Sequence, residues 1–279
     1  MDQKLKPENG GSSSKLNNEQ SKALEQHLES TIYTRVIEIC AYVLKTFGIQ
    51  YTVSGMTKWL QNNNFRYKRP KEVPAKADPE KQEEFIESYL ALVDETPPDQ
   101  PILFVDATHP TMATKMVCGW IKKGVDKSIA QTASRTRVNV IGAIELGSMN
   151  IVSQLPECVN GETIIDFFDK LKSVYPDAPK IHLILDQAGY HRSQLVRDEA
   201  LKRAIELHYL PPYSPNLNPI ERLWKVMNEK VRNNVFFSSA KIFRKAIEEF
   251  FDKTIQKIYN VLKVRINDDF QTINPVRSS

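Results

Sequence analysis

The sequence predicts an α/β protein in which a mixed sheet flanked by helices follows a small all-α unit. Before residue 98 the apolar residues recur at three-and-four spacing, which is typical of amphipathic helices. After residue 98 short apolar runs of strand length come first, and strand and helix patterns then alternate. The 279 residues are enough for one full-sized domain and a smaller one.

Composition narrows the class of protein. The three cysteines, Cys40, Cys118 and Cys158, are too few and too scattered for a disulfide framework or a cysteine-based zinc site. No apolar run approaches the roughly 18 residues that a membrane span needs. The first 20 residues have no apolar core, so they cannot be a signal peptide. We therefore expect a cytoplasmic, nucleoid-associated protein without a membrane partner.

Five segments are expected along the chain. Their boundaries lie where polar, Pro-rich or basic stretches interrupt the periodic patterns. In order they are a disordered polar leader (1–18), a helix-turn-helix region (19–74), a linker helix (75–97), an α/β domain (98–262) and a C-terminal tail (263–279).

The N-terminal region predicts helices from residue 19 and over residues 34–47. Gly48 is expected to end the second helix as a left-handed residue after the cap. Thr52 or Ser54 can cap a third helix, on which Val53, Met56 and Leu60 are expected to face inward. Helix, short turn and helix form a helix-turn-helix, here in a small all-α (winged) domain.

Basic residues gather on and after this third helix. Between residues 56 and 75 there are five basic residues and one acidic residue. Such a segment would hold positive charge against DNA phosphates while the helix enters the major groove. The alternative is a small helical bundle with a solvated basic loop. The candidate DNA-contacting residues are Lys58, Arg66, Lys68, Arg69 and Lys71.

The rest of the chain predicts one more helix at 79–93 and then the sheet. Strands are expected at 102–105, 138–144, 150–153, 181–185 and 206–209. Helices are expected at 163–174, 193–204, 218–231 and 240–262. A second basic cluster lies between the first two strands. It consists of Lys122, Lys123, Arg135 and Arg137.

Three acidic residues are the candidate catalytic and metal-binding residues. Asp106 and Asp186 each follow an apolar strand run, and Glu221 begins a helix, with 34 residues between Asp186 and Glu221. A sheet would hold the two aspartates nearly side by side, where like charges repel. Mg²⁺ prefers carboxylate oxygens and would remove that repulsion. Two such ions about 3.5–4 Å apart are typical of enzymes that cut phosphodiesters.

Each of these acids also has a structural interpretation. An aspartate at a strand end often forms a turn, and Asn218 with Glu221 fits a capping box at the start of a helix. His109 and His191 could contact phosphate or orient a carboxylate, and we leave both outside the catalytic set. Trp224 is expected to pack in the core.

Other side chains near the acids give no clear function from the sequence. Tyr190 and Tyr213 could stack on DNA or pack within loops. Ser193 and Ser214 lack a histidine and an acid at triad spacing, which disfavours a serine hydrolase.

Three stretches resemble the DDE transposases of bacterial insertion-sequence family 630, within the mariner-like superfamily. They are the strand ending on Asp106, the run LILDQAGYHRS around Asp186, and LPPYSPNLNPIERLW around Glu221. The spacing of 34 between the second and third acids is also the family's own. The resemblance covers roughly residues 18–251, and the last of these motifs is highly specific.

The resemblance implies a ribonuclease H-like fold, two Mg²⁺ ions (or Mn²⁺) and a catalytic triad of Asp106, Asp186 and Glu221. It further implies cut-and-paste transposition: cleavage at element ends, then attack of the freed 3′ hydroxyl on target DNA at TA. The implied partners are double-stranded DNA, as terminal inverted repeats and target, and a second copy of the chain as a homodimer on paired ends.

One departure from the family lies at the N-terminus. Family members usually carry a further helix-turn-helix module ahead of the one seen here, whereas this chain begins with a polar leader. A shortened copy or an alternative start would explain that difference.

Two other functions are compatible with the same residues. One is a catalytically silent DNA-binding relic or repressor of the element, which would shift terminal-repeat DNA without cutting it. The other is a structure-specific nuclease of the same fold, which would cut branched or damaged DNA without strand transfer.

Overall fold

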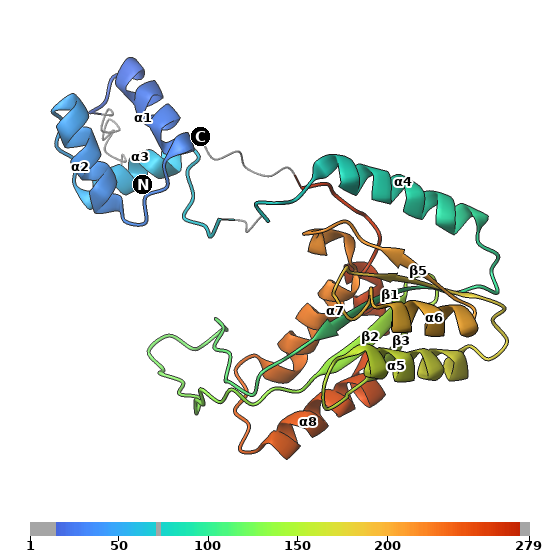
Figure 1. The fold of residues 1–279 in the computed structure, drawn as a ribbon. Helices are drawn as coiled ribbons and strands as arrows, with labels where there is room; N and C mark the ends of the chain where they lie inside the picture. The colour runs from blue at the N-terminus through green and yellow to red at the C-terminus, as the bar shows by residue number, and fades with distance from the viewer. Residues whose placement is uncertain (1–14, 71–73, 274–279) are drawn as a thin grey trace, which may run out of the picture. The chain divides into compact units, whose positions relative to one another are not determined.

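The computed structural model describes residues 15–70 and 74–273 (Figure 1). The chain divides into two compact units, Met1–Lys71 and Glu72–Ser279. The first is helical and the second contains the sheet. The predicted α/β class with a helical unit ahead of it is therefore confirmed.

Three helices make up the first unit: α1 (Asn18–Ser30), α2 (Val36–Phe47) and α3 (Val53–Asn62). Gly48 follows α2 with a φ of 67°, the left-handed conformation that glycine adopts without strain. The Thr52 side chain accepts a hydrogen bond from the Gly55 N–H and so caps α3. Residues 15–70 contain no strand.

The inward face of α3 differs from the expected one. Met56 is fully buried as predicted, but Val53 is 47% exposed and Trp59 is buried instead. Val53 is the first residue of α3. Trp59 follows Met56 by three residues and therefore shares its face.

Part of the expected leader belongs to this helical unit. Leu16 is 4% exposed within its core, and the Asn17 side chain caps α1 by accepting from the Gln20 N–H. The expected leader therefore includes ordered residues from 15 onward. Its earlier part, 1–14, lies outside the described residues.

The second unit is built on one five-stranded sheet in the order β3-β2-β1-β4-β5. β1 (Ile102–Thr108) pairs antiparallel with β2 (Val140–Glu145), and β2 pairs antiparallel with β3 (Asn150–Gln154). On the other side β1 pairs parallel with β4 (Ile181–Leu185), and β4 with β5 (Ile205–Tyr209). The sheet is therefore mixed, as predicted, with β5 at one edge.

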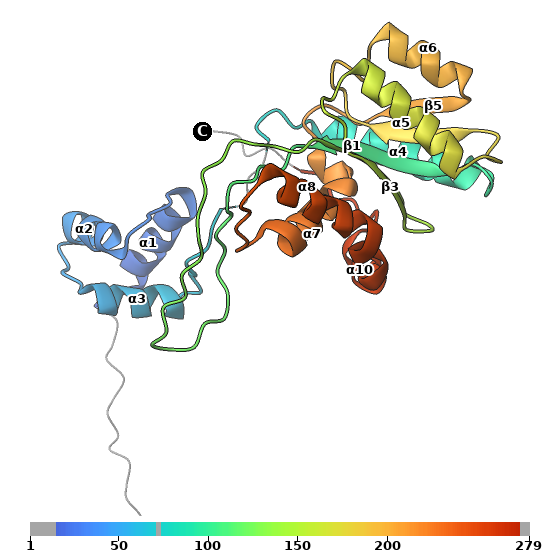
Figure 2. The same cartoon turned by 90° about the horizontal axis from the view of Figure 1, so that it is seen from below.

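Helices cover both faces of the sheet (Figures 1 and 2). On one face α5 (Gly161–Val174) and α6 (Gln194–Lys202) bury Phe168 and Val196 against Leu103 and Leu183. On the other face α7 (Ile220–Met227) and α8 (Ala240–Glu249) cover Phe104 and Ile184. The alternation of strand side chains between the two faces explains both cores.

Two segments expected outside the α/β domain pack within its core. Helix α4 (Pro79–Glu95), expected as a linker helix, buries Tyr89 against Phe104 and so contributes to the core of the second unit. Phe270, in the expected C-terminal tail, packs on the same two rings. The part of that tail at 274–279 lies outside the described residues.

Several elements end elsewhere than predicted. β1 continues through Asp106 to Thr108, because its pairing with β2 extends to Val140. The predicted helix at 218–231 is shorter: a 3-10 turn (Pro215–Leu217) precedes α7 and a π-helical turn (Asn228–Arg232) follows it. The predicted helix at 240–262 is broken into α8, a π-helical turn (Phe250–Thr254), α9 (Ile255–Lys257) and α10 (Tyr259–Arg265).

A glycine on β2 lets α7 approach the sheet closely. A Cβ atom added to Gly142 would lie 2.5 Å from Cη2 of Trp224. Trp224 is only 3% exposed, so its ring has little room to move. Gly142 is also the register partner of Asp106 on β1. The missing side chain therefore determines where the indole lies relative to that carboxylate.

Within residues 15–70 and 74–273, no helix is long and apolar enough to cross a membrane.

Replacing Tyr89 with alanine tests the place of α4 in the core. We expect Tyr89→Ala to lower the free energy of unfolding of the second unit by about 3 kcal/mol, because a large buried aromatic ring is lost. Urea denaturation followed by circular dichroism measures the change. Leu90→Ala on the same helix is the control, since Leu90 is 55% exposed and should cost far less. Equal losses would contradict a core position for α4.

Gly142→Ala tests the close packing of Trp224. The added methyl group should force the indole away and destabilise the unit by about 1–3 kcal/mol, as overpacking does. Urea denaturation measures this loss. Gly147→Ala is the control, because nothing lies within 4 Å of a Cβ at that position. A Gly142→Ala variant as stable as Gly147→Ala would show that the ring is not fixed by the glycine.

Candidate active site

The three acidic residues singled out in the sequence line a single hollow of about 460 Å³. Asp106 lies within β1, Asp186 follows the last residue of β4, and Glu221 is the second residue of α7. All three are partly buried. Elements that are far apart in sequence thus bring the three carboxylates to one place.

Strand register explains why the two aspartates are neighbours. β1 and β4 run parallel with Phe104 opposite Ile184. Two residues further along each strand, Asp106 and Asp186 come to the same face of the sheet. α7 covers that face, and Glu221 lies on it one turn before Trp224.

Asp106 is held by the buried indole of α7. The Trp224 Nε1–H donates to Oδ2 of Asp106 over 2.7 Å. Burial, and then the neighbouring Glu221 charge, raise the pKa of Asp106 to about 7, with a smaller contribution from Asp186. The hydrogen bond from Trp224 opposes this rise. At neutral pH the Asp106 carboxyl group of the folded chain is therefore close to the midpoint between its protonated and ionised forms.

Asp186 is held by a buried histidine. His191 Nδ1 lies 2.7 Å from Oδ1 of Asp186, and the Ala188 N–H donates to the same oxygen over 3.0 Å. The His191 bond is the main reason that the pKa of Asp186 is lowered. His191 is 1% exposed, and its carbonyl accepts from the Tyr209 hydroxyl. This imidazole orients the carboxylate.

Glu221 does not form the capping box that its spacing with Asn218 allowed. Pro219 caps α7 without a side-chain bond, and the Asn218 amide instead donates to the Val105 carbonyl over 3.3 Å. Burial is the main cause of a raised pKa at Glu221; Lys225 opposes it and Asp186 adds to it. The glutamate thus faces the hollow rather than the end of its own helix.

The donor set of the hollow fits hard divalent cations. Three carboxylates lie there beside Asn218, whose buried side-chain oxygen has no hydrogen-bond partner. Mg²⁺ and Mn²⁺ bind such oxygens and keep several waters. The three acids do not converge on one point. Among the described residues, the group whose three ligand atoms all lie within 4.8 Å of one another is His182, Glu206 and His208, which lies elsewhere on the sheet.

The predicted basic residues lie on the surface, in two places. Lys58, Arg66, Lys68 and Arg69 are exposed on and after α3, and the Arg66 guanidinium also donates to the Gln61 and Phe65 carbonyls. Lys71 lies outside the described residues. The second cluster is on the long connection between β1 and β2. Its members Lys122, Lys123, Arg135 and Arg137 are all exposed.

The structure gives four further residues a place at the site. Trp224 and His191 bond the aspartates, Asn218 supplies an unpaired oxygen, and exposed Arg192 lines the hollow. The sequence placed Trp224 in the core, which is confirmed, but gave no sign that its N–H meets Asp106. The orienting role considered for His191 is the one that its contact supports.

The remaining sequence candidates have structural contacts. His109 Nδ1 lies 2.8 Å from the Asn139 side-chain oxygen. Ser193 caps α6 by accepting from the Val196 N–H. Tyr213 is exposed beside the hollow, and Tyr190 packs its ring edge-on against His191.

Residues 101–244 match the family described as DDE superfamily endonuclease, and residues 33–89 match a winged helix-turn-helix family. The first match covers more than half of the chain and contains all three acids.

Two curated bacterial proteins are similar in sequence. The insertion element IS630 uncharacterized 39 kDa protein of Shigella sonnei is 24% identical over 211 residues, which is 74% of this chain and 60% of that protein. The uncharacterized protein y4pE/y4sA of Sinorhizobium fredii (strain NBRC 101917 / NGR234) is 34% identical over 83 residues, 30% of this chain and 58% of that protein. The chain thus spans about 60% of the length of these relatives.

Solved structures of Mos1 transposase share the fold. The mariner Mos1 paired end complex with Mg aligns with a TM-score of 0.66 and 16% identity, over 95% of this chain and 80% of that one. The Mos1 paired-end complex with left transposon end gives 0.64 and 15%, over 90% and 80%. The chain therefore belongs to the DDE superfamily endonucleases, with a ribonuclease H-like fold, a helix-turn-helix region ahead of it, and a distant homologue in the insertion element IS630 protein.

Proposed function

We propose that this chain is a metal-dependent DNA transposase. It would cleave phosphodiesters at the ends of a mobile element and join the freed 3′ hydroxyl to target DNA at TA dinucleotides. The observation that supports the proposal best is the meeting of Asp106, Asp186 and Glu221 in one hollow. Membership of the DDE endonuclease family agrees with it.

The proposed cofactor is a pair of Mg²⁺ ions, for which Mn²⁺ can substitute. Asp106, Asp186 and Glu221 would hold them. When bound, such ions activate the attacking oxygen and neutralise charge on the leaving oxygen. One of the Mos1 structures described above is a complex with Mg, and a further solved structure is the Mos1 mariner paired end complex with Mn.

The chain's own residues prepare the site for positive charge. Trp224 hydrogen-bonds Asp106 and His191 hydrogen-bonds Asp186. These bonds restrict rotation of the two carboxylates, so they cannot turn away from one another to relieve their repulsion. The raised pKa values of Asp106 and Glu221 measure that repulsion together with burial. Carboxylates that are held close together and partly buried from water bind cations more strongly than a fully solvated cluster of carboxylates does.

Arg192 is the basic residue that lines the hollow. It is exposed, and its guanidinium lies 3.3 Å from the Gln187 side-chain oxygen. Arginine binds phosphate oxygens in a fork geometry. We propose that it orients the scissile phosphate, while Asn218 helps to complete the oxygen-rich wall.

The proposed DNA partners are the element's terminal inverted repeats and the target duplex. On the helical unit, α3 would enter the major groove, with Lys58, Arg66, Lys68, Arg69 and Lys71 at phosphates. On the catalytic unit, Lys122, Lys123, Arg135 and Arg137 would hold the duplex by charge. A homodimer on paired ends is part of the proposal, since the similar Mos1 structures are paired-end complexes.

Asp186→Asn is expected to reduce cleavage by about 10³-fold or more, because ions held by carboxylates supply several kcal/mol of transition-state stabilisation. The substrate is a labelled duplex carrying each end of the DNA that flanks the coding region, incubated with Mg²⁺ or Mn²⁺. Products are resolved by length under denaturing conditions, which separates cleaved ends from strand-transfer products. Glu221→Gln should behave in the same way.

Asp198→Asn is the matched control, since Asp198 is exposed on α6 and outside the hollow. Undiminished cleavage by Asp186→Asn would overturn its role. Wild-type protein that shifts these duplexes but never cuts them would indicate a silent DNA-binding relic. Cutting of branched DNA without any joined product would indicate a structure-specific nuclease.

Asp106→Asn should stabilise the metal-free protein at alkaline pH. The pKa of Asp106 rises from 3.8 to about 7 on folding, so the folded state binds a proton more tightly than the unfolded chain does. That contribution to stability is fully present below pH 4 and is lost as the pH rises through 7. At about 1.4 kcal/mol per pKa unit, the loss is a few kcal/mol. Asparagine carries no charge and avoids it.

Urea denaturation in EDTA at pH 5 and pH 8.5 measures this difference. We expect Asp106→Asn to be more stable than wild type at both pH values, and its advantage to be clearly larger at pH 8.5 than at pH 5, where Asp106 is still protonated in the folded chain. Asp198→Asn, at an exposed position outside the hollow, is the control variant. If Asp106→Asn and wild type keep the same difference at both pH values, the carboxylate is not strained in the folded chain.

A further inference from the structure

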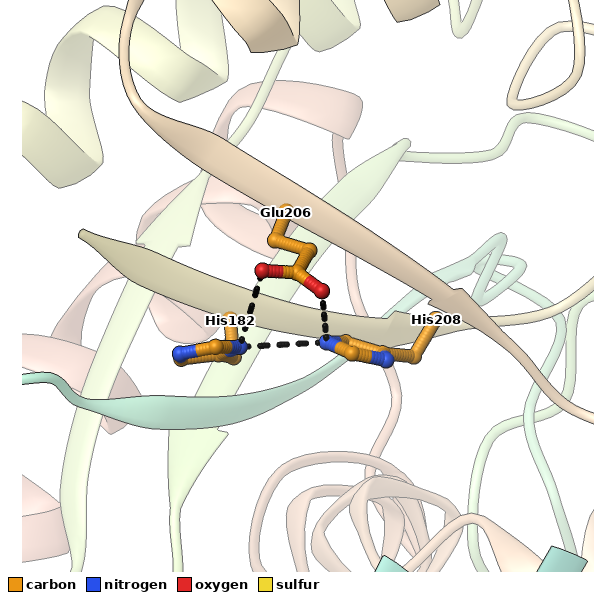
Figure 3. A group of neighbouring side chains, drawn as sticks. All are labelled: His182, Glu206 and His208. Atoms are coloured by element: carbon orange, nitrogen blue, oxygen red, sulfur yellow. Dashed lines mark hydrogen bonds and ion pairs between the residues drawn. The ribbon is translucent and has the colours of Figure 1, made fainter. Parts of the chain in front are cut away.

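A second group of potential metal ligands lies on the sheet, away from the three acids. His182 is the second residue of β4, and Glu206 and His208 are on the neighbouring edge strand β5 (Figure 3). His182 is the register partner of Glu206, and His208 lies two residues further along the same face. Parallel pairing of the two strands therefore places three potential ligands, two imidazoles and a carboxylate, side by side.

Their ligand atoms converge on one point. His182 Nδ1 lies 3.1 Å from His208 Nε2, and the Glu206 carboxylate oxygens lie 3.8 Å from the first nitrogen and 3.9 Å from the second. All three ligand atoms fall within 4.8 Å of one another. Two nitrogens bound tetrahedrally at about 2.0–2.1 Å from zinc are about 3.3 Å apart. The imidazole pair is already close to that separation.

The side chain of Gln100 sets the tautomer of His182. Gln100 Oε1 lies 3.2 Å from His182 Nε2, so this ring nitrogen carries the hydrogen and donates it. The lone pair of His182 is then on Nδ1, which points toward His208 and Glu206 (Figure 3). Metal-binding histidines commonly have their second nitrogen fixed by such a hydrogen bond. His182 is also buried, so its orientation is restricted by packing.

We propose that His182 Nδ1, His208 Nε2 and Glu206 bind one zinc-class transition-metal ion. Two imidazoles and a carboxylate are a ligand set found at zinc sites, with water as the fourth ligand. Mg²⁺ and Ca²⁺ are hard ions that take oxygen ligands, so this nitrogen-rich group disfavours them. The exposed carboxylate of Glu206 leaves a route for the ion to enter.

Two groups must change partners when the ion binds. In the metal-free chain His208 Nε2 donates to His182 Nδ1, so the His208 proton must move to its other ring nitrogen. Lys180 Nζ holds the Glu206 carboxylate at 2.8 Å and must release or share it. Lys180 is exposed, and such an ion pair costs little to break. Lys180 still competes with a cation for the Glu206 carboxylate. Removing Lys180 should therefore strengthen metal binding, whereas removing a ligand should weaken it.

The site is separate from the proposed catalytic centre. His182 and Asp186 are four residues apart along β4 and its extension, so their backbones are about 13 Å apart at 3.3 Å per residue. A bound ion would join edge strand β5 to β4 by side chains in addition to backbone bonds. β5 leads directly into the segment that carries Asn218 and Glu221. The expected role is therefore stabilisation of this edge, and it does not depend on DNA cleavage.

Zinc binding by the purified full-length chain, free of any histidine tag, tests the proposal. Zn²⁺ is titrated against a chromophoric chelator in excess Mg²⁺, which occupies oxygen-only sites. Wild type should bind one equivalent of Zn²⁺, and Co²⁺ in its place should show the visible absorption of a tetrahedral nitrogen-containing site. The thermal unfolding temperature should rise with Zn²⁺.

The variants separate metal binding from simple packing. His208→Gln and Glu206→Gln each remove a ligand. Loss of a residue that only hydrogen-bonds a ligand weakens metal binding roughly 10–100-fold, so loss of the ligand itself should weaken Zn²⁺ binding by more than that. Lys180→Gln removes the competitor and should tighten binding. Glu206→Gln and Lys180→Gln break the same ion pair, so a purely structural role would change both alike. His27→Gln removes a histidine from the helical unit and should change nothing.

The outcomes are distinct. Loss of the bound equivalent in His208→Gln and Glu206→Gln, with tighter binding in Lys180→Gln, supports the site. No Zn²⁺ bound by wild type, or equal binding by all five proteins, overturns it. Because His182 is buried, the less buried His208 and the exposed Glu206 are the residues to replace, and their circular dichroism spectra should match wild type.

Discussion

Burial of three neighbouring carboxylates, together with the repulsion among them, is the constraint on which the second unit depends. Asp106 and Asp186 come to one face because β1 and β4 are parallel and in register, and α7 adds Glu221 to the same face. Such an arrangement costs stability unless cations are present. The hydrogen bonds from Trp224 and His191 hold the aspartates against that cost. Gly142 leaves room for the Trp224 indole and so allows its hydrogen bond to Asp106.

The sequence predicted much of this fold because its signals are local. β4 carries five apolar or half-apolar residues in a row, and both of its ends match the prediction. Gly48 and Thr52 delimit helices by backbone chemistry that depends on few neighbours. Predictions were wrong where packing from elsewhere decides. Pairing with β2 lengthens β1 past Asp106, and α4 packs on the sheet although its neighbouring residues resemble a linker.

The same distinction holds for the candidate site. The positions of Asp106, Asp186 and Glu221 followed from strand ends, a helix start and a specific motif, and the structure gathers them in one hollow. Trp224 and Asn218 could not be assigned, because their partners are 118 and 113 residues away in the sequence. The spacing of Asn218 and Glu221 fits a capping box, but the Asn218 side-chain amide donates to the Val105 carbonyl instead. Local rules thus fail where long-range hydrogen bonds compete.

The two ends of β4 illustrate how one strand can support two chemistries. At its carboxyl end, oxygen donors and mutual repulsion fit hard ions that keep their water. At its amino end, His182 with Glu206 and His208 offers nitrogen donors, a fixed tautomer and a separation that fits a softer ion. Ligand type therefore separates the two sites even where both ions are present. An ion at the amino end would tighten the edge strand without entering the hollow that the three carboxylates line.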